Sequence, residues 1–434
     1  MTLHYEDGGL RLFHGSNKDI LPTFPDASFD SIVTDPPYEL GFMGKGWDSS
    51  GIAYDVDVWR ECFRVLKPGG YMLAFGGTRT WHRIAVAIED AGFEIRDSIA
   101  WMYGSGFPKS MNVAKAIAGH ESGHGSNSGA IRRATMGDAY VPSGRLGNRG
   151  GEGRRDTGLN EHELELTENA KAWEGWGTAL KPAFEPIIVA RKPLVGTVAA
   201  NVLAYGTGAI NIDACRVQTT DSLGGGRGTG SVKAAHEGWN RPFMDDLAAA
   251  QEMAARAREA QAKGEALGRF PSNVLLDESQ SAELDRQAPD TGGAGKASGP
   301  SLREPTDPGV AFGARRGLVG EPAFYGDRGG ASRFFPTFRY EAKAPGSERP
   351  EVDGVAHATV KPLDLMRWLV RLVTRRGGHV LDLFAGSGTT GEAALLEGME
   401  CTLIELEADH LPLILARVRK PLQTSLFGDW EDAS

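Results

Sequence analysis

A short segment near the C-terminal end constrains the fold of this 434-residue chain more than any other. Residues 379–384 and 401–405 are each predicted to form a strand, and a glycine-rich turn and a helix opening at 392–397 lie between them. A strand–helix–strand piece of this size cannot bury both of its faces by itself, so it must join another sheet. We therefore predict one α/β sheet that is built from both ends of the chain and interrupted by a central irregular insertion.

The N-terminal part of the chain supplies the partner strands. Residues 29–34 and 71–75 are predicted strands, and apolar side chains at helical spacing predict a helix over 55–66 between them. A second helix is predicted over 79–91 and a third strand over 93–102. Strands that alternate with helices in this way indicate a mostly parallel sheet.

The central part of the chain has a different composition. Residues 119–160 are rich in Gly, Ser and Arg, which is typical of a flexible surface loop and also fits a loop that closes over nucleic-acid phosphates. Residues 196–345 look irregular apart from an Ala-rich helix over 245–266, and strand–helix alternation is expected again only after residue 355. The predicted regions are one half of the main domain over 1–118, an insertion over 119–345, the other half over 346–420 and a mobile tail over 421–434.

The glycine-rich turn indicates a nucleoside cofactor. Gly386, Gly388 and Gly391 have the spacing GxGxxG, which lets a ligand approach the backbone at a helix N-terminus. Glu405 ends the next predicted strand, 19 residues after Gly386, and an acid at that distance suits the hydroxyls of a ribose. NAD would present a pyrophosphate to such a turn and S-adenosylmethionine a carboxylate, and the glycines alone do not decide between them.

The tetrapeptide Asp35-Pro36-Pro37-Tyr38 directly follows the first predicted strand. An exocyclic amino group of a base is a poor nucleophile, and two hydrogen-bond acceptors would localise its lone pair and stabilise the positive charge that grows during methyl transfer. Asp35 can supply a carboxylate, Pro36 a carbonyl on a rigid backbone, and Tyr38 a ring that stacks on a flipped base. The alternative is a proline-rich turn in which Tyr38 only packs in the core.

Together these motifs resemble those of amino-group DNA methyltransferases of the β circular arrangement, in which the catalytic tetrapeptide comes first, a target-recognition region second and the cofactor turn last. The resemblance rests on residues 29–38, 66–70, 357–362 and 382–390, while 104–110, 208–213 and 268–273 resemble a subgroup common in phages and prophages. It implies a Rossmann-like methyltransferase sheet with S-adenosylmethionine as the cofactor.

The resemblance also implies a role for each matching residue. Asp35, Pro36, Pro37 and Tyr38 would hold the target amine as the catalytic residues. The residues implied to bind the cofactor are His357, Lys361, Asp382, Phe384, Gly386, Ser387, Gly388, Thr389, Thr390 and Glu405, with Glu405 on the ribose and Lys361 and His357 at the methionine end. The family usually has proline after this histidine, whereas this chain has Ala358, which would loosen the turn. Lys361-Pro362 would otherwise mark only the start of a helix.

The expected reaction is methylation of the N6 amino group of adenine in double-stranded DNA, because an acid at the first tetrapeptide position resembles adenine enzymes more often than cytosine enzymes. N4 methylation of cytosine stays open, as does a non-catalytic nucleic-acid binder that keeps the cofactor as a structural ligand. An NAD-dependent dehydrogenase fits the glycine turn but leaves the tetrapeptide unexplained. Region 119–345 is expected to carry DNA recognition, partly through Arg132, Arg133, Arg154 and Arg155.

Composition narrows the cellular context. No apolar run approaches the roughly 18 residues of a membrane span. Cys62, Cys215 and Cys401 form no CxxC or metal pattern, so a reducing cytoplasm and no metal are expected. The net charge of −10 gives no global sign of a nucleic-acid partner, although a basic groove can lie on an acidic protein. In the tail, Gln423 to Phe427 resembles the peptide by which bacterial replication and repair proteins bind the sliding clamp. The alternative is that the tail folds back onto the α/β domain. A homodimer is left open.

Overall fold

The computed structural model describes residues 2–40, 50–104, 106, 110–122, 166–219, 255, 256, 259, 262, 266–289, 329–338, 350–352, 354–357 and 359–419. Its α-helices are α1 (Asn17–Ile20), α2 (Val56–Val65), α3 (Trp81–Asp90), α4 (Val113–Glu121), α6 (Glu168–Lys171), α7 (Val198–Tyr205), α9 (Glu278–Gln287), α10 (Leu363–Val373), α11 (Thr389–Leu396) and α12 (Leu411–Val418). No helix in this part of the chain is both long enough and apolar enough to cross a membrane. The chain divides into two compact units, one of Met1–Met102 with Glu185–Ser434 and the other of Tyr103–Phe184.

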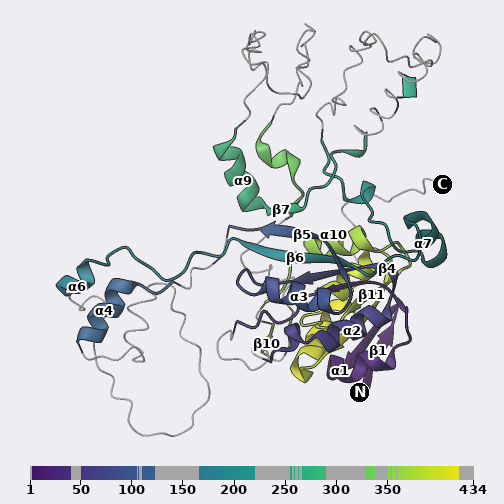
Figure 1. Ribbon diagram of the computed structural model, residues 1–434, viewed down its shortest axis with the longest axis horizontal. Helices are drawn as coiled ribbons and strands as arrows, with labels where there is room; N and C mark the ends of the chain where they lie inside the picture. The colour runs from purple at the N-terminus through teal and green to yellow at the C-terminus, as the bar shows by residue number, and fades with distance from the viewer. Residues whose placement is uncertain are drawn as a thin grey trace, which may run out of the picture. The chain divides into compact units, whose positions relative to one another are not determined.

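Ten strands of the described chain form one sheet (Figure 1). In spatial order they are β1 (Thr2–Asp7), β2 (Leu10–His14), β12 (Glu400–Glu405), β11 (His379–Asp382), β3 (Phe29–Thr34), β4 (Leu66–Phe75), β6 (Phe184–Arg191), β5 (Glu94–Met102), β7 (Val274–Asp277) and β8 (Thr337–Phe338). Strands β2, β12, β11, β3 and β4 run parallel to one another, whereas β6 runs antiparallel to β4. Because β11 pairs directly with β3, the prediction of one α/β sheet built from both ends of the chain is confirmed.

The predicted N-terminal elements are present, with one difference at β4. This strand begins at Leu66 rather than at Tyr71, because the segment between these residues stays in the sheet as an irregularity in the pairing of β3 with β4. Gly69 lies in this segment with φ of +76°, and a Cβ there would come within 2.4 Å of the Asn201 amide nitrogen. Glycine is therefore required by both backbone conformation and space.

The expectation that strand–helix order returns only after residue 355 is wrong. Strands β6, β7 and β8 arise between residues 184 and 338 and extend the same sheet beyond β4. The boundaries of the two compact units therefore differ from the regions expected from the sequence. The predicted helix over 245–266 lies mostly outside the described residues, as do Ala358, the four loop arginines and the clamp-like peptide.

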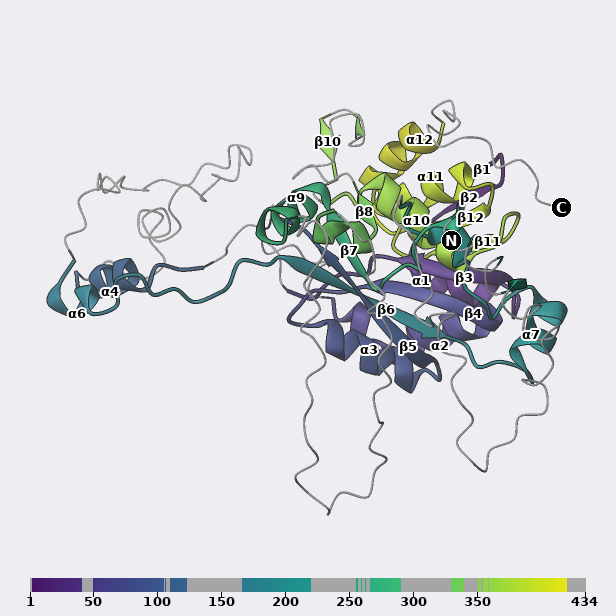
Figure 2. The same ribbon diagram turned by 90° about the horizontal axis from the view of Figure 1, so that it is seen from above.

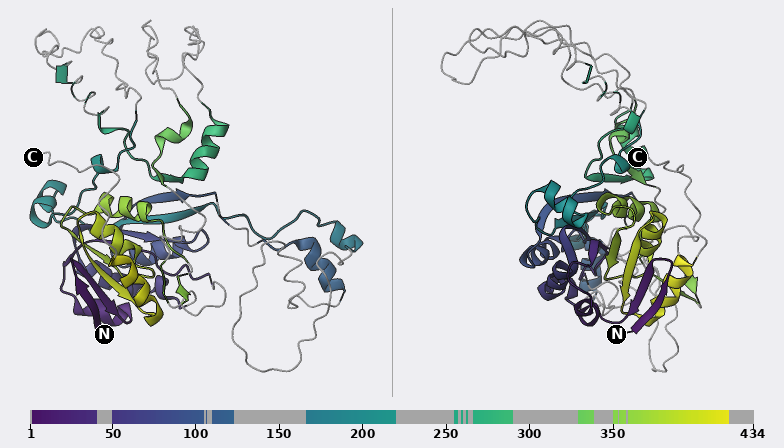
Figure 3. Two further views of the ribbon diagram at one scale, coloured as in Figure 1. Left: turned by 180° about the vertical axis from the view of Figure 1, so that it is seen from behind. Right: turned by 90° about the vertical axis from the view of Figure 1, so that its right-hand side faces the viewer.

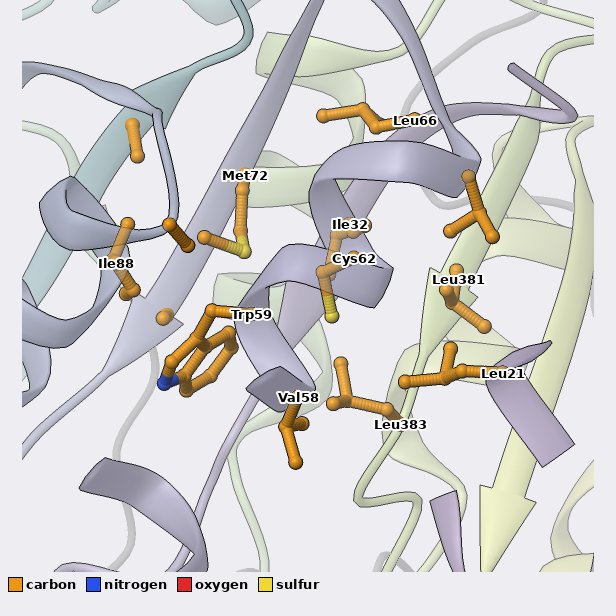
Figure 4. Packing of buried hydrophobic residues seen from close by; sticks show 14 of the residues in the cluster. Leu21, Ile32, Val58, Trp59, Cys62, Leu66, Met72, Ile88, Leu381 and Leu383 are labelled. Atoms are coloured by element: carbon orange, nitrogen blue, oxygen red, sulfur yellow. The ribbon is translucent and has the colours of Figure 1, made fainter. Parts of the chain in front are cut away.

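The core of the larger unit forms where helices cover both faces of the sheet. Helices α2 and α3 lie on one face, and α10 and α11 lie on the other (Figures 2 and 3). Helix α2 buries Val58, Trp59, Cys62 and Val65, which recur at helical spacing, and its N-cap Asp55 accepts a hydrogen bond from the second residue of the helix. Figure 4 shows the side chains of α2 packed among residues of β3, β4 and β11. This packing fixes the strands whose ends carry the candidate site.

The smaller unit is built around the short helices α4 and α6. An isolated β-bridge joins Asn112 to Gly177, and the side chain of Asn169 donates a hydrogen bond of 2.7 Å to Glu121 at the end of α4. The rings of Trp173 and Trp176 pack edge to face with their centroids 5.2 Å apart. These contacts hold the two helices together within this unit.

Candidate active site

The candidate site lies at one edge of the sheet, where the parallel strands end. Strand β11 pairs with β12 on one side and with β3 on the other, so the ends of these three strands lie next to one another. They carry Glu405, Asp382 and Thr34, and Thr34 leads directly into the tetrapeptide that begins at Asp35. Ligands of open α/β sheets bind at such a point, where the chain turns to opposite sides of one strand.

Asp382 fastens the tetrapeptide strand to the glycine turn. One carboxylate oxygen accepts hydrogen bonds from the Thr34 hydroxyl at 2.7 Å and from the Phe384 backbone N–H at 3.0 Å. The other oxygen accepts from the Thr390 hydroxyl at 2.6 Å. Burial raises the pKa of Asp382 to about 6 in spite of these three hydrogen bonds. Asp382 therefore acts here as a link between β3, β11 and α11, rather than as an open acceptor for a ligand.

The glycine turn has the backbone that its sequence predicts. Gly386 and Gly388 have φ of +53° and +79°, and the Gly388 N–H donates to the Ala385 carbonyl to close the turn before α11. Arg417, which is 1% exposed, donates from Nε to the Ser387 carbonyl at 3.1 Å. Its Nη1 atom lies 2.6 Å from the Glu392 carboxylate, so α12 holds the turn against α11. The hydroxyl oxygens of Ser387 and Thr389 lie 3.0 Å apart and are buried.

Glu405 lies against the glycine turn, as its position at the end of β12 predicts. Its Oε2 atom accepts a hydrogen bond of 2.7 Å from the Gly386 N–H. Its Oε1 atom accepts from the Glu407 N–H at 2.9 Å and lies 3.2 Å from Nδ1 of His410. A carboxylate oxygen can accept two hydrogen bonds, so Oε2 retains acceptor capacity for a hydroxyl of a ligand.

His357 lies beside the same turn and packs against His410, with ring centroids 4.6 Å apart. It follows the hairpin of β9 (Glu351–Val352) and β10 (Val355–Ala356), and a Cβ at Gly386 would lie 3.2 Å from its Nε2 atom. Nδ1 lies 2.6 Å from the Thr359 carbonyl and 3.3 Å from the Thr359 backbone nitrogen, and a proton on Nδ1 satisfies the shorter of these two contacts. Burial, with the nearby His410 ring, lowers the pKa of His357 to about 4, so the ring is neutral and Nε2 is an acceptor.

Lys361 lies against the tetrapeptide. Its Nζ atom is 2.9 Å from Oδ2 of Asp35 and 2.9 Å from the Tyr38 hydroxyl, which accepts from it. It also lies 3.1 Å from Oε2 of Glu185. These three acceptors match the three N–H bonds of the ammonium group. The expected role of Lys361 at the methionine end of the cofactor stays a prediction, whereas its contacts in this structure are with the tetrapeptide.

The other carboxylate oxygen of Asp35 differs from the one that contacts Lys361. Oδ1 of Asp35 is buried and has no hydrogen-bond partner among the described residues. A buried acceptor of this kind is costly unless a ligand completes it. Pro36 is buried beside it, and the chain turns away at Glu39, whose φ is +54°.

Glu185 is the functional candidate that the sequence did not reveal. It stands near the start of β6 and accepts a hydrogen bond of 3.0 Å from the Tyr38 hydroxyl. The Gly76 N–H donates to the Pro186 carbonyl, so the start of this antiparallel strand meets the end of β4. The apolar run at 187–190 could have suggested a strand, but its direction and neighbour could not be read from the chain.

The residues of the glycine turn fit S-adenosylmethionine on their chemistry. Glu405 supplies acceptors for ribose hydroxyls, and the turn supplies backbone N–H groups before α11. The space beside Gly386 is one that a side chain would fill. Among the described residues, no group of three or more His, Cys, Asp or Glu side chains could hold a metal ion.

Comparison with known proteins points to one family. A family model described as "DNA methylase" matches residues 29–123 and 178–416, which include the tetrapeptide, Glu185 and the glycine turn. A putative methylase, YubD of Escherichia coli, is 35% identical over 91 residues, which are 20% of this chain and 39% of that protein. The type II methyltransferase M.HindIII of Haemophilus influenzae is 28% identical over 160 residues, 36% of this chain and 38% of that protein. The matches thus span under two fifths of these relatives.

Solved structures with similar chains are more distant in sequence. The crystal structure of M1.HpyAVI has 12% identity and a TM-score of 0.38, with 94% of this chain and 98% of that chain covered. The PvuII DNA methyltransferase, which is described as cytosine-N4-specific, has 11% identity and a TM-score of 0.39, with 96% and 90% covered.

Proposed function

Because this chain belongs to the DNA methylase family, we propose that it transfers a methyl group from S-adenosylmethionine to the N6 amino group of a flipped adenine in double-stranded DNA. The observation that carries the proposal is the buried Oδ1 atom of Asp35, which lacks a hydrogen-bond partner among the described residues. It stands at the same sheet edge as the glycine turn. An amino group that donates to this atom would complete it.

The chain's own residues would activate the amine by accepting its hydrogens. Oδ1 of Asp35 accepts one N–H and the Pro36 carbonyl accepts the other, which concentrates the lone pair on nitrogen. S-adenosylmethionine, when bound, supplies the methyl group on a positively charged sulfur. Formation of the N–C bond would break the methyl–sulfur bond, whose electron pair would stay with the departing sulfur. Positive charge would grow on the amine nitrogen beside the Asp35 carboxylate, and this attraction would lower the barrier. The nitrogen would then give one proton to solvent, which leaves a neutral methylamino group on the base.

Different residues would bind the nucleoside end and the amino-acid end of the cofactor. Glu405 accepts the ribose hydroxyls, and the backbone N–H groups at the start of α11 face the carboxylate. His357, as a neutral ring, offers Nε2 as an acceptor next to Gly386. The Ser387, Thr389 and Thr390 side chains are engaged with one another or with Asp382, so they shape the turn.

The proposal is tested with purified protein, double-stranded DNA and labelled S-adenosylmethionine. The expected product is N6-methyladenine, identified by mass spectrometry of the digested DNA. Asp35→Ala should reduce the single-turnover rate by about a hundredfold to a thousandfold, as for loss of one preorganised group at a reacting centre. The affinity for S-adenosylhomocysteine should change by less than about threefold, which is under 1 kcal/mol.

Asp57→Ala is the matched control, because Asp57 is an exposed carboxylate on α2 whose side chain is 82% exposed. It should retain the wild-type rate. Label found only in cytosine would replace adenine by cytosine as the target, because the two amino groups share the same geometry. No transfer to any DNA, with intact cofactor binding, would leave the non-catalytic binder and contradict the proposed reaction.

Four finer expectations belong to this proposal. They are DNA recognition by residues 119–345, which the structure describes only in part, docking of the tail on a sliding clamp, a homodimer and a cytoplasmic location. The tail lies outside the described residues. Long-read sequencing of DNA from expressing cells would report the modified base and its sequence context together.

A further inference from the structure

One buried ammonium group is shared by two carboxylates and a phenol at the tetrapeptide. Lys361 contacts Asp35 on β3's end, Tyr38 three residues later and Glu185 on β6 at distances of 2.9, 2.9 and 3.1 Å. The Lys361 side chain is 12% exposed, and those of Glu185 and Asp35 are 20% and 25% exposed. Its Nζ atom also lies 4.6 Å from the centre of the Phe75 ring. The cluster is thus largely shielded from water, where charges interact strongly.

The ammonium group does not neutralise both of the carboxylates that it contacts. Among the described residues, Lys361 lies against Asp35 and Glu185, so one positive charge is shared by two negative ones. Burial alone lowers the pKa of Lys361, but the Asp35 and Glu185 carboxylates outweigh it and hold the pKa above its ordinary value. Burial, followed by the same two carboxylates, raises the pKa of Tyr38 well above its ordinary value. Lys361 therefore stays an ammonium and Tyr38 stays a phenol that donates to Glu185.

We propose that Glu185 is a positioning residue for methyl transfer, which holds Lys361 and Tyr38 so that Asp35 keeps both its negative charge and its orientation toward the target amine. This inference rests on the proposed function. Without Glu185, Lys361 would be shared by one carboxylate fewer and would pair more closely with Asp35, which would offset more of the negative charge that Asp35 presents to the amine. Tyr38 would also lose the acceptor of its hydroxyl, which is buried with it.

The fold explains why a residue so far along the chain can act here. Glu185 and Tyr38 are 147 positions apart, and β6 is the strand that runs against its neighbour β4. Its reversed direction brings its beginning, rather than its end, to the edge where the parallel strands finish. Glu185 is therefore supplied by the antiparallel strand to the edge where parallel strands supply Asp382 and Glu405.

The test compares Glu185→Gln, Glu185→Asp and a control on the full-length protein. Glu185→Gln keeps the size and an acceptor for Tyr38 but removes the charge, so kcat should fall about tenfold to a hundredfold, less than for a group that touches the amine. The KM for DNA and the affinity for S-adenosylhomocysteine should change by less than about threefold. Glu185→Asp should recover part of the rate because it restores the charge.

Glu94→Gln is the matched control, since Glu94 pairs with Arg191 at the other end of β6 at 2.6 Å. It should retain kcat, although it too loses an ion pair of the same strand. Thermal melting of each variant, with and without S-adenosylhomocysteine, reports whether a lost rate reflects lost folding.

A double-mutant cycle separates positioning through Lys361 from an independent structural effect. If Glu185 acts through Lys361, Glu185→Gln with Lys361→Met should lose little more rate than the worse single variant. Any of three results would overturn the inference. The rate losses of the two single variants could multiply in the double variant, or the kcat of Glu185→Gln could lie within about twofold of wild type. The third result is an equal loss of rate and of cofactor affinity in Glu185→Gln. Absence of methyl transfer by the wild-type protein would instead refute the proposed function, so the two failures are distinguishable.

Discussion

Replacing Glu405 by glutamine should weaken both cofactor binding and the stability of the fold. The side chain is 6% exposed, and its two oxygens accept from the N–H groups of Gly386 and Glu407 at 2.7 and 2.9 Å. Glutamine keeps one acceptor but places its NH₂ group against the other N–H, so one charge-assisted hydrogen bond is lost. Such a bond contributes about 1.5–3 kcal/mol, which sets the expected decrease in the free energy of unfolding without ligand.

The effect on the cofactor adds to this loss in the bound state. A ribose hydroxyl that donates to a carboxylate contributes about 1.5–3 kcal/mol, whereas a neutral amide oxygen contributes roughly half as much. Losing the charge and one acceptor for the hydroxyls should therefore raise the Kd for S-adenosylhomocysteine by about tenfold to a hundredfold. Isothermal titration calorimetry measures this Kd, and urea unfolding without ligand measures the stability of the fold.

Glu400→Gln is the matched control, because Glu400 opens the same strand and its side chain is 64% exposed. It should leave both quantities near the wild-type values. A Glu405→Gln protein with reduced stability but unchanged Kd would show that Glu405 only fastens the glycine turn. A protein with neither change would contradict the hydrogen bonds on which the reasoning depends.

Two further predictions concern the frame of the site. Gly388→Ala should lower the free energy of unfolding by at least about 1 kcal/mol more than Gly377→Ala, as measured by urea unfolding. Both glycines have positive φ, but of the two only Gly388 would place a Cβ 2.9 Å from a side chain of α12. Equal losses of stability in the two variants would show that the contact relaxes freely. For Asp382, whose pKa is raised to about 6 in the fold, the stabilising contribution is complete below the unfolded pKa and is lost as pH rises through about 6. From pH 7.5 to pH 5 the wild type should therefore gain on the order of 1 kcal/mol relative to Asp382→Asn, and parallel pH profiles of the two proteins would refute this.

The sequence by itself determined the parts of this site that depend on local structure. Gly386 and Gly388 form the turn that their spacing predicts, and Glu405 meets this turn because parallel strands finish at one edge. The same rule brought Asp35 to that edge, since a strand that ends in two prolines must finish there. Each of these predictions needed only the order of a strand, a turn and a helix.

The tertiary structure decided what completes the site from distant parts of the chain. Glu185 reaches Tyr38 because β6 reverses direction beside β4, and no local pattern states which neighbour a strand will take or in which direction. Lys361 contacts Asp35 and Glu185 from a distant part of the chain, and its position at the cofactor stays a prediction. Strand partners and buried ion pairs depend on the free energy of the whole packed core, which a reading of adjacent residues does not contain.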